Sequence, residues 1–249
     1  MEDEKDYFKS STFNGLKFRN IGPAWSSGRI SDFAVNPNNF SEYYVATSSG
    51  GLWKTTNSGT TWTPIADTIQ AYAMGCVTLD PNNPYVVWLG TGENKHQRAL
   101  GYGTGVYKAI VGGQSWKYMG LKDSRQIGGI VVDPRNSNVI YVAAEGSVWG
   151  PGGERGLYKS TDGGNTWNNV LKISEHTGVN NIILDPRNPD VLYATSEQRR
   201  RHVFTKIGGG PESAVYKSTD AGATWEKIMK GLPSVDLGGI ARKSRCNLS

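Results

Sequence analysis

The sequence predicts an all-β fold built from repeated four-stranded antiparallel blades, and three observations lead to this prediction. The chain is rich in residues of strands and tight turns, with 32 Gly, 8 Trp and 12 Tyr against 3 His. A segment that ends in Trp recurs four times, and a second segment that opens on Asn-Pro or Asp-Pro recurs in the same phase. Four strands in every ~50 residues are typical of β-propeller blades.

The first repeated segment starts with lysine, carries glycine in its middle and ends on tryptophan. Its copies are Lys54–Trp62, Lys108–Trp116, Lys159–Trp167 and Lys217–Trp225. The second segment is followed each time by a β-rich run, and its copies begin at Asn36, Asp80, Asp133 and Asp185. Because two independent motifs keep one register, we interpret them as parts of one repeating unit.

One unit divides into four strands, which we name A to D in chain order. In the third unit they are expected at Gly129–Asp133, Val139–Ala144, Leu157–Ser160 and Thr166–Ile173. The Asp-Pro turn ends strand A, because proline fixes φ and donates no hydrogen bond. A glycine-rich loop (residues 145–156) joins B to C, and the Asp162-Gly-Gly turn joins C to D.

The C–D turn, which we call the Asp-box turn, has a predicted physical role. Asp162 and Asp220 are expected to accept backbone N–H bonds within the turn, and Asn57 takes this role in the first copy. In the second copy Val111 and Ala109 replace the acidic and hydroxyl residues, so this turn is predicted to be the weakest of the four. The tryptophans expected to cover the blades are Trp62, Trp116, Trp167 and Trp225.

Residues 16–240 carry the repeats, between an N-terminal tail (1–15) and an irregular C-terminal tail (241–249). Leu16–Ile21 resembles a D strand that could complete the last blade of a ring, and Gly231–Ile240 starts a fifth strand A. A fifth opening strand argues against closure at four blades, so we expect part of a larger ring of about seven blades. Open edges expose apolar faces, and self-association through them is expected.

Composition narrows the function classes. Lys and Arg number 27 against 22 Asp and Glu, a net charge of +5, which does not indicate nucleic-acid binding. No apolar run reaches the ~20 residues of a membrane span, and no signal peptide is visible, so the sequence leaves the localisation open. Cys76 and Cys246 have no metal-ligand spacing, and Cys76 is expected to be a buried apolar residue. We expect no metal and no cofactor.

With these motifs, residues 158–167 and 216–225 resemble the Asp-box (bacterial neuraminidase repeat) superfamily of β-propellers. That superfamily includes sialidases, xyloglucan-cleaving glycoside hydrolases, sortilin-type receptors and a photosystem II assembly factor. With its Asp-Pro turns, the chain most resembles large bacterial sortilin-like or glycosyl-hydrolase-like proteins. The resemblance implies a secreted or periplasmic protein. It implies no single activity, because members share blades and not chemistry.

The xyloglucan-cleaving relatives carry a catalytic Asp at the end of an early strand B, and the matching stretch here is Thr47–Trp53. Ser48 occupies the acidic position, and a serine cannot act as the carboxylate base of inverting hydrolysis. We therefore assign no catalytic residue. The chain is expected to be non-catalytic, and if it is an enzyme, a glycoside hydrolase.

The short turns mark one face of a propeller, and the long B–C loops mark the face with room for a ligand. Glu93, Glu145 and Glu197 recur at the end of strand B in successive blades. One interpretation is a carboxylate ring near the central channel, for a cation, a hydroxyl-rich ligand or a catalytic acid. The alternative is that each lies at a solvated strand end or pairs with Arg98, Arg155 or Arg199.

The same loops hold further candidates. Trp149 is expected either to stack on a sugar or peptide, or to pack beneath its own loop. His96 and His202 are too isolated for a zinc site. The run Arg199, Arg200 and Arg201 either docks an acidic partner or forms a solvated loop.

The leading hypothesis is a non-catalytic recognition module that binds a glycan or peptide on its B–C loop face. One alternative is the N-terminal part of a xyloglucanase-like glycoside hydrolase whose catalytic acid lies outside this chain. A second alternative is a scaffold for protein assembly, which rests on the arginine run.

Overall fold

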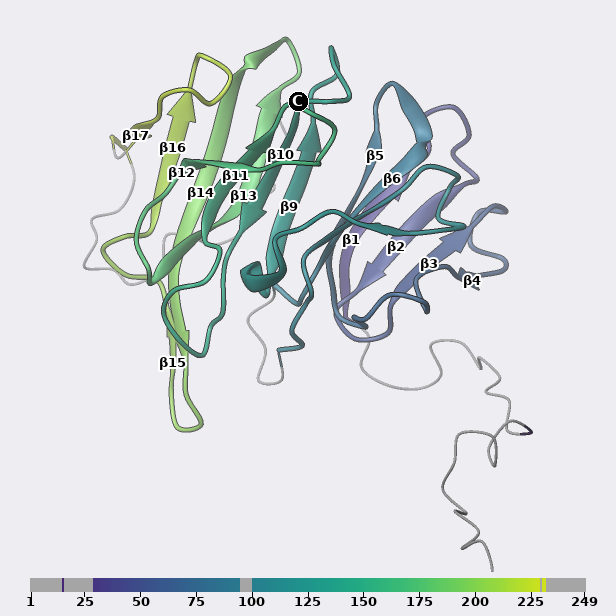
Figure 1. Ribbon diagram of the computed structural model, residues 1–249, viewed down its shortest axis with the longest axis horizontal. Coiled ribbons are helices and arrows are strands. Elements are labelled where there is room, and N and C mark those ends of the chain that lie inside the picture. The colour runs from purple at the N-terminus through teal and green to yellow at the C-terminus, as the bar shows by residue number, and fades with distance from the viewer. Residues whose placement is uncertain (1–14, 16–28, 95–99, 229, 232–249) are drawn as a thin grey trace, which may run out of the picture.

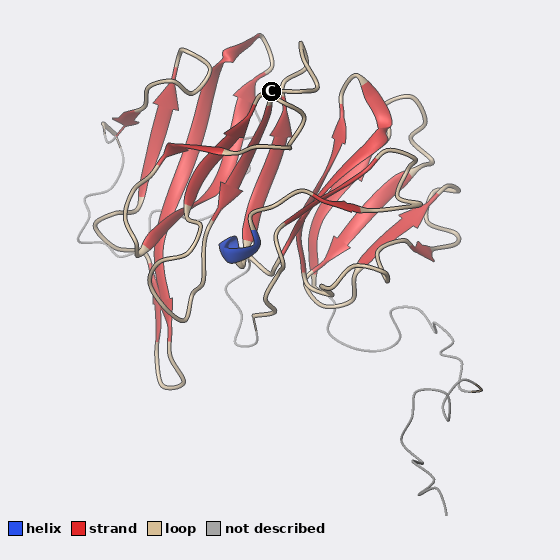
Figure 2. Ribbon diagram, viewed as in Figure 1, coloured by secondary structure: helices blue, strands red, loops and turns tan. Residues whose placement is uncertain are grey.

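The computed structural model describes residues 15, 29–94, 100–228 and 230–231. These residues form four antiparallel sheets that follow one another along the chain, each corresponding to one predicted blade (Figure 1). In the described part the one helical element is a short 3-10 turn, η2 (Lys122–Ser124), drawn in blue in Figure 2. The predicted all-β fold of four-stranded blades is confirmed.

Strands pair in chain order within every blade. Blade one holds β1 (Ile30–Val35), β2 (Tyr43–Thr47), β3 (Leu52–Thr55) and β4 (Thr63–Pro64). Blade two holds β5 (Met74–Asp80), β6 (Asn83–Thr91), β7 (Val106–Ala109) and β8 (Lys117–Tyr118). Blade three holds β9 (Ile127–Val132), β10 (Ile140–Ala144), β11 (Gly156–Ser160) and β12 (Asn168–Leu171). Blade four holds β13 (Thr177–Asp185), β14 (Asn188–Arg201), β16 (Ala214–Ser218) and β17 (Glu226–Ile228).

The third blade matches its predicted strands to within a few residues, and the outermost strand departs most. Strand D was expected over Thr166–Ile173, and β12 spans Asn168–Leu171. Strand D lies at the rim, where it pairs only with strand C. The residues before β12 are held instead in the Asp-box turn, so fewer of them can join the sheet.

The hydrophobic core lies between neighbouring blades. In β10, Ile140 and Val142 pack in the cluster shared with blade two, whereas Tyr141 and Ala143 pack in the cluster shared with blade four. This alternation follows from the two-residue period of a strand, because a blade with a neighbour on each side must present apolar residues to both. Cys76 lies buried in the cluster between blades two and three, as predicted.

The Asp-box turns show the predicted polar contacts. In the third copy Thr166 donates its N–H to Asp162 Oδ1 at 2.9 Å and its hydroxyl to Asp162 Oδ2 at 2.6 Å. Ser160 Oγ accepts the Gly164 N–H at 2.9 Å. The fourth copy repeats these contacts around Asp220 and Ser218, and the first copy places Asn57 and Thr55 in the same roles. Val111 and Ala109 cannot accept such bonds, which leaves the second turn without this support.

The tryptophans of these turns also link blades. Trp116 donates its indole N–H to Ile65 O of blade one at 2.6 Å, and Trp167 donates to Met119 O of blade two at 2.6 Å. Trp225 instead bonds to Gly222 O of its own turn at 3.2 Å. Trp62 lies 38% exposed beside Tyr43. Trp116 and Trp167 therefore bond to the preceding blade, and the Trp225 ring packs in the apolar cluster between blades three and four.

Several predictions fall on residues outside the described part. They concern the N-terminal tail apart from Gly15, the strand at residues 16–21, the fifth strand A beyond Gly231, the C-terminal tail, His96, Arg98 and Cys246. Among the residues that are described, no helix is long and apolar enough to cross a membrane.

Candidate functional site

The B–C loops, together with the connections between blades, lie opposite the Asp-Pro and Asp-box turns. The turn η2, which links blades two and three, lies at the same end of the blades as the β14–β15 hairpin (Figures 1 and 2). That hairpin occupies the place where a third B–C loop was expected from Glu197 to Lys206. Strand β14 instead continues to Arg201 and pairs with β15 (Lys206–Gly208). A turn of only four residues allows the two strands to extend beyond the blade.

The three glutamates at the strand-B ends are all buried. Arg29 Nε donates to Glu93 Oε1 at 3.1 Å and also forms an ion pair with it. Glu145 forms an ion pair with Arg199, and Asn180 Nδ2 donates to Glu197 Oε2 at 3.4 Å. Each carboxylate therefore has a partner within the protein. Among the described residues, no three His, Cys, Asp or Glu side chains are grouped closely enough to hold a metal ion.

Arg199 joins three blades at this end of the molecule. Its guanidinium pairs with Glu145, donates to Gln126 Oε1 at 3.0 Å and donates to Asn94 O at 3.2 Å. Arg199 lies in blade four, Glu145 and Gln126 lie just beyond the ends of blade-three strands, and Asn94 lies in the B–C loop of blade two. Sequence reasoning named Arg199 and Glu145 but missed Gln126 and Arg29, because no motif marks them.

Arg155 holds the loop between β10 and β11 in one shape. Its guanidinium donates to four backbone carbonyls of that loop, those of Glu145, Ser147, Gly150 and Gly152. Burial, together with the nearby charges of Arg200 and Arg199, lowers the pKa of Arg155 to about 10. Arg155 contacts the backbone of Glu145 and acts as a brace for the loop.

We call three of the exposed aromatic side chains on this face the aromatic strip: Tyr72, Tyr102 and Trp149, which are 62%, 44% and 40% exposed. The Tyr102 hydroxyl lies 3.2 Å from Ser147 Oγ, which also accepts the Trp149 N–H at 3.1 Å. Gly101 packs so tightly on Ala73 that an added Cβ would lie 2.6 Å from the Ala73 Cβ. The loops of the strip are thus in contact.

A shallow hollow in blade one adjoins the aromatic strip, because Tyr72 belongs to both. This hollow has a volume of about 430 Å³ and is lined by Gly50, Gly51, Ala66, Asp67 and residues 69–72. The Tyr72 carbonyl accepts the N–H groups of Gly50 and Gly51, at 3.2 and 2.8 Å. Ser48, two residues before Gly50, is fully buried, and its Oγ lies 2.7 Å from Ser31 Oγ.

The remaining predicted residues lie on the β14–β15 hairpin. Arg200 Nη2 lies 2.9 Å from His176 Nδ1, and the Arg201 N–H donates to Val148 O at 2.9 Å. The His202 ring stacks on Phe204 with centroids 5.5 Å apart. The arginine run is therefore part of a strand, and its first member points into the protein rather than into solvent.

Comparisons with known proteins agree with this fold. A family model described as Sortilin-Vps10 (sortilin, neurotensin receptor 3) matches residues 105–244. A xyloglucanase from Hypocrea jecorina (strain QM6a) is 25% identical over 244 residues, 86% of this chain and 27% of that protein. A xyloglucanase from Paenibacillus sp is 22% identical over 237 residues, 85% of this chain and 22% of that protein. The chain thus spans about a quarter of the length of these relatives.

Solved structures show the same fold. An ancestral GH74 enzyme superposes with a TM-score of 0.65 at 22% identity, covering 83% of this chain and 26% of that one. The GH74 xyloglucanase from Xanthomonas campestris gives a TM-score of 0.59 at 18% identity, covering 82% and 30%. The predicted superfamily is confirmed. The family model matches more than half of the residues of this chain, and the chain therefore belongs to the Sortilin-Vps10 family.

Proposed function

We propose that the chain is a recognition module whose B–C loop face binds a polysaccharide along the aromatic strip. The observation that carries this proposal is the exposure of Tyr72, Tyr102 and Trp149 on loops of three blades that contact one another. Exposed aromatic faces provide apolar area for sugar rings, and the phenol groups add hydrogen-bonding positions. A row of such rings suits an extended chain of sugars better than a single small molecule.

The strip is held rigidly, which supports a binding role. Arg155 fixes the loop that carries Trp149 through its bonds to four carbonyls, and Ser147 links that loop to Tyr102. The Arg125 guanidinium lies 5.7 Å from the Tyr102 ring centroid. A surface ordered before the ligand arrives loses less entropy on binding.

The relatives supply the first ligand to test. Proteins named xyloglucanases align with most of this chain, so a β-glucan of the xyloglucan type is the proposed ligand class. A secreted or periplasmic location fits such a ligand. The buried ion pair of Arg199 with Glu145 speaks against the scaffold hypothesis, since an acidic partner would have to compete with this contact within the protein.

Affinity electrophoresis in gels that contain xyloglucan, cellulose derivatives or unrelated polysaccharides tests the proposal. We expect Trp149→Ala and Tyr102→Ala to weaken binding about tenfold each, the equivalent of roughly 1.4 kcal/mol. Tyr85→Ala is the matched control, because Tyr85 is also exposed, at 60%, but lies at the opposite end of blade two. Equal retardation of all three variants, or no retardation of the wild-type chain by any polysaccharide, would exclude the strip as a glycan site.

A second candidate function is that of the binding part of a glycoside hydrolase. The alignment with about a quarter of each xyloglucanase favours it. Ser48 is buried and carries no carboxylate, so the proposal is that this chain binds polysaccharide without cleaving it. Release of reducing ends from xyloglucan by the purified chain, abolished by Glu93→Gln but not by Glu226→Gln, would show that the chain itself is catalytic.

A further inference from the structure

A groove lies at the rim of the molecule where blades two and three meet, and we call it the rim groove. Its volume is about 500 Å³, within the range of pockets that hold small organic ligands. Its lining consists of residues 117–121 of blade two and the connection after it, and of Glu154, Tyr158 and residues 164–167 of blade three. All of these residues lie within 100–228, which the structure describes without a gap, and apolar clusters join both blades to a neighbour on each side.

Three aromatic side chains line the rim groove: Tyr118, Tyr158 and Trp167. Contacts within the protein hold two of these rings in place. Trp167 donates its indole N–H to Met119 O at 2.6 Å, and the Tyr118 ring packs on Tyr107 with centroids 5.6 Å apart. Tyr118 is nevertheless 47% exposed. The groove therefore offers ordered aromatic area on which a flat, partly apolar ligand can pack.

A carboxylate is fixed at one end of the groove, where the B–C loop enters β11. Glu154 Oε2 accepts the Asp123 N–H at 2.7 Å, and the Glu154 N–H donates to Asp123 O at 3.3 Å. Burial and the charge of Glu154 raise the pKa of Tyr118 and of Tyr158, which places the carboxylate near both phenols. One carboxylate oxygen is thus used within the protein, and the other can accept a hydrogen bond from a ligand.

The Asp-box turn supplies polar groups at the other end of the groove, after β11. Asn165 Nδ2 donates to Asp162 O at 2.6 Å, and the Thr166 hydroxyl donates to Asp162 Oδ2 at 2.6 Å. These bonds fix both side chains by their donors. The amide oxygen of Asn165 and the hydroxyl oxygen of Thr166 can still accept hydrogen bonds.

The charges of the lining favour a neutral ligand. Lys117 and Glu154 are the charged residues among those that line the groove. An anion would be repelled by Glu154 and a cation by Lys117, whereas a neutral ligand avoids both repulsions. Aromatic rings between hydrogen-bonding groups suit a ligand with apolar ring faces and hydroxyl groups at its edge. A short saccharide has this chemistry.

The joint between blades one and two shows that the aromatic lining is not general. A smaller cavity of about 230 Å³ lies there, and none of the residues that line it is aromatic or acidic. Pro64 takes the place of Tyr118, since Pro64 pairs with Trp53 as Tyr118 pairs with Tyr107. The rim groove therefore owes its chemistry to residues particular to blades two and three.

We propose that the rim groove is a second carbohydrate site, which binds a short neutral saccharide against Tyr118 and Trp167. Glu154 at one end, and Asn165 and Thr166 at the other, accept hydrogen bonds from its hydroxyl groups. The groove shares no residue with the aromatic strip. This proposal therefore goes beyond the function proposed for the strip and does not rest on it.

Nuclear magnetic resonance of the backbone amides during titration with cellobiose, a neutral disaccharide, tests the proposal. We expect chemical-shift changes to concentrate on residues 117–121, 154, 158 and 164–167, with a Kd of about 1 to 10 mM. Tyr118→Ala should raise this Kd about tenfold, and Tyr118→Phe, which keeps the ring, should change it by less than about twofold. Tyr85→Ala is the control at an exposed tyrosine outside the groove. The amide spectrum itself establishes that each variant is folded.

Two further comparisons make the test specific. Glucuronate and choline, an anion and a cation of small size, should bind the groove more weakly than cellobiose. The double variant Tyr102→Ala/Trp149→Ala should keep the shift changes in the groove, so the strip and the groove can fail separately. Groove amides that cellobiose does not move, a Tyr118→Ala variant that binds like the wild type, or tighter binding of either ion would each overturn the proposal.

Discussion

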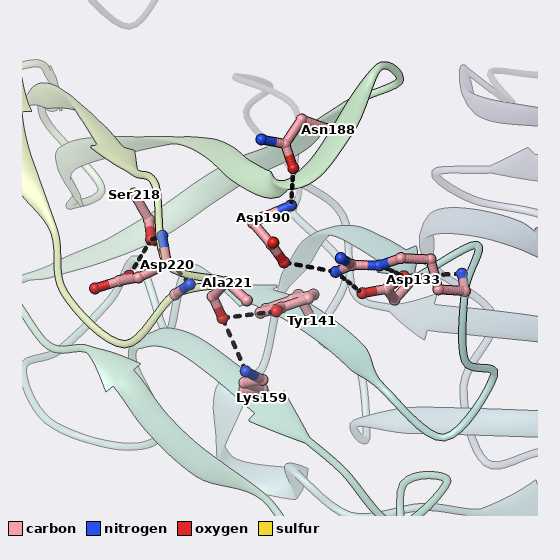
Figure 3. Close-up of polar contacts among 10 residues, drawn as sticks. Asp133, Tyr141, Lys159, Asn188, Asp190, Ser218, Asp220 and Ala221 are labelled. Atoms are coloured by element: carbon pink, nitrogen blue, oxygen red, sulfur yellow. Dashed lines mark hydrogen bonds and ion pairs between the residues drawn. The ribbon is translucent and has the colours of Figure 1, made fainter.

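The hydroxyl of Tyr141 in blade three donates a hydrogen bond of 2.7 Å to the carbonyl of Ala221 in blade four (Figure 3). Lys159 Nζ donates to the same oxygen at 2.8 Å, so the carbonyl has two donors from the neighbouring blade. Burial raises the pKa of Tyr141 to about 12, and the phenol therefore remains a donor over the whole physiological range. The joint between these blades is polar at its rim and apolar inside.

Removal of the Tyr141 hydroxyl should weaken this joint. We expect Tyr141→Phe to lower the free energy of unfolding by about 1 kcal/mol, the usual net contribution of one hydrogen bond. Lys159 keeps the carbonyl partnered, so the loss stays modest. Tyr85→Phe, at an exposed tyrosine, should leave stability unchanged. Urea denaturation measures the free energy of unfolding of both variants. An equal decrease in the two would contradict a stabilising role for the Tyr141 hydrogen bond.

The buried ion pair of Arg199 with Glu145 should be costly to break on one side. Both side chains are about 5% exposed, so Arg199→Met leaves a carboxylate buried without its cation. We expect Arg199→Met to lower the free energy of unfolding by about 3 to 5 kcal/mol, and the double variant Arg199→Met/Glu145→Leu to lower it by less. Arg187→Met, which breaks the exposed pair with Asp185, should cost less than about 1 kcal/mol. If Arg199→Met lowers the free energy of unfolding no more than Arg187→Met does, the Arg199–Glu145 pair does not stabilise the contact between blades.

The second Asp-box turn should gain from restoration of its acidic residue. Val111 is exposed, and its counterparts accept the N–H and hydroxyl of the residue four positions later, which here is Ser115. We expect Val111→Asp to raise the free energy of unfolding by about 1 kcal/mol and the melting temperature with it. Ile110→Asp adds the same charge at an exposed neighbour without these partners and should not stabilise. A Val111→Asp protein that melts no higher than wild type would contradict the prediction.

Acid should weaken the Asp-box turns of blades three and four. Hydrogen bonds from Thr166 and Ser160 lower the pKa of Asp162 to about 2, and those from Thr224 and Ser218 do the same for Asp220. A carboxyl whose pKa falls on folding stabilises the protein above its unfolded pKa, here 3.8, and loses that contribution as the pH falls toward 2. The melting temperature should therefore fall between pH 4 and 2.

The variant Asp162→Asn is the matched test, because Asn57 already fills this position in blade one without titrating. Its melting temperature should fall less between pH 4 and 2 than that of the wild type. Scanning calorimetry at several pH values in this range gives the comparison. An identical fall in the two proteins would place the acid sensitivity in other carboxyl groups, such as Asp185, whose pKa is also about 2.

The fold was largely readable from the sequence because the repeat encodes it locally. Asp162, Ser160 and the turn glycines interact within a few residues, so their spacing alone predicts the turn that forms. Alternation of apolar residues in β10 likewise predicts a strand buried on both faces. The outer strand was less predictable, since the end of β12 depends on how many residues the preceding turn retains.

The candidate site depended on contacts that no local pattern contains. The sequence by itself determined the blades, the turns and the end of the protein at which Glu145, Trp149 and Arg199 lie. Only the tertiary structure decided that Arg199 is buried against Glu145, that Arg155 braces a backbone loop, and that Tyr102 contacts Ser147 in the loop of Trp149. These pairs join residues from different blades or distant points of one loop, and their approach is fixed by how blades pack. A repeat in the sequence specifies each blade, but it does not record which side chains of neighbouring blades meet.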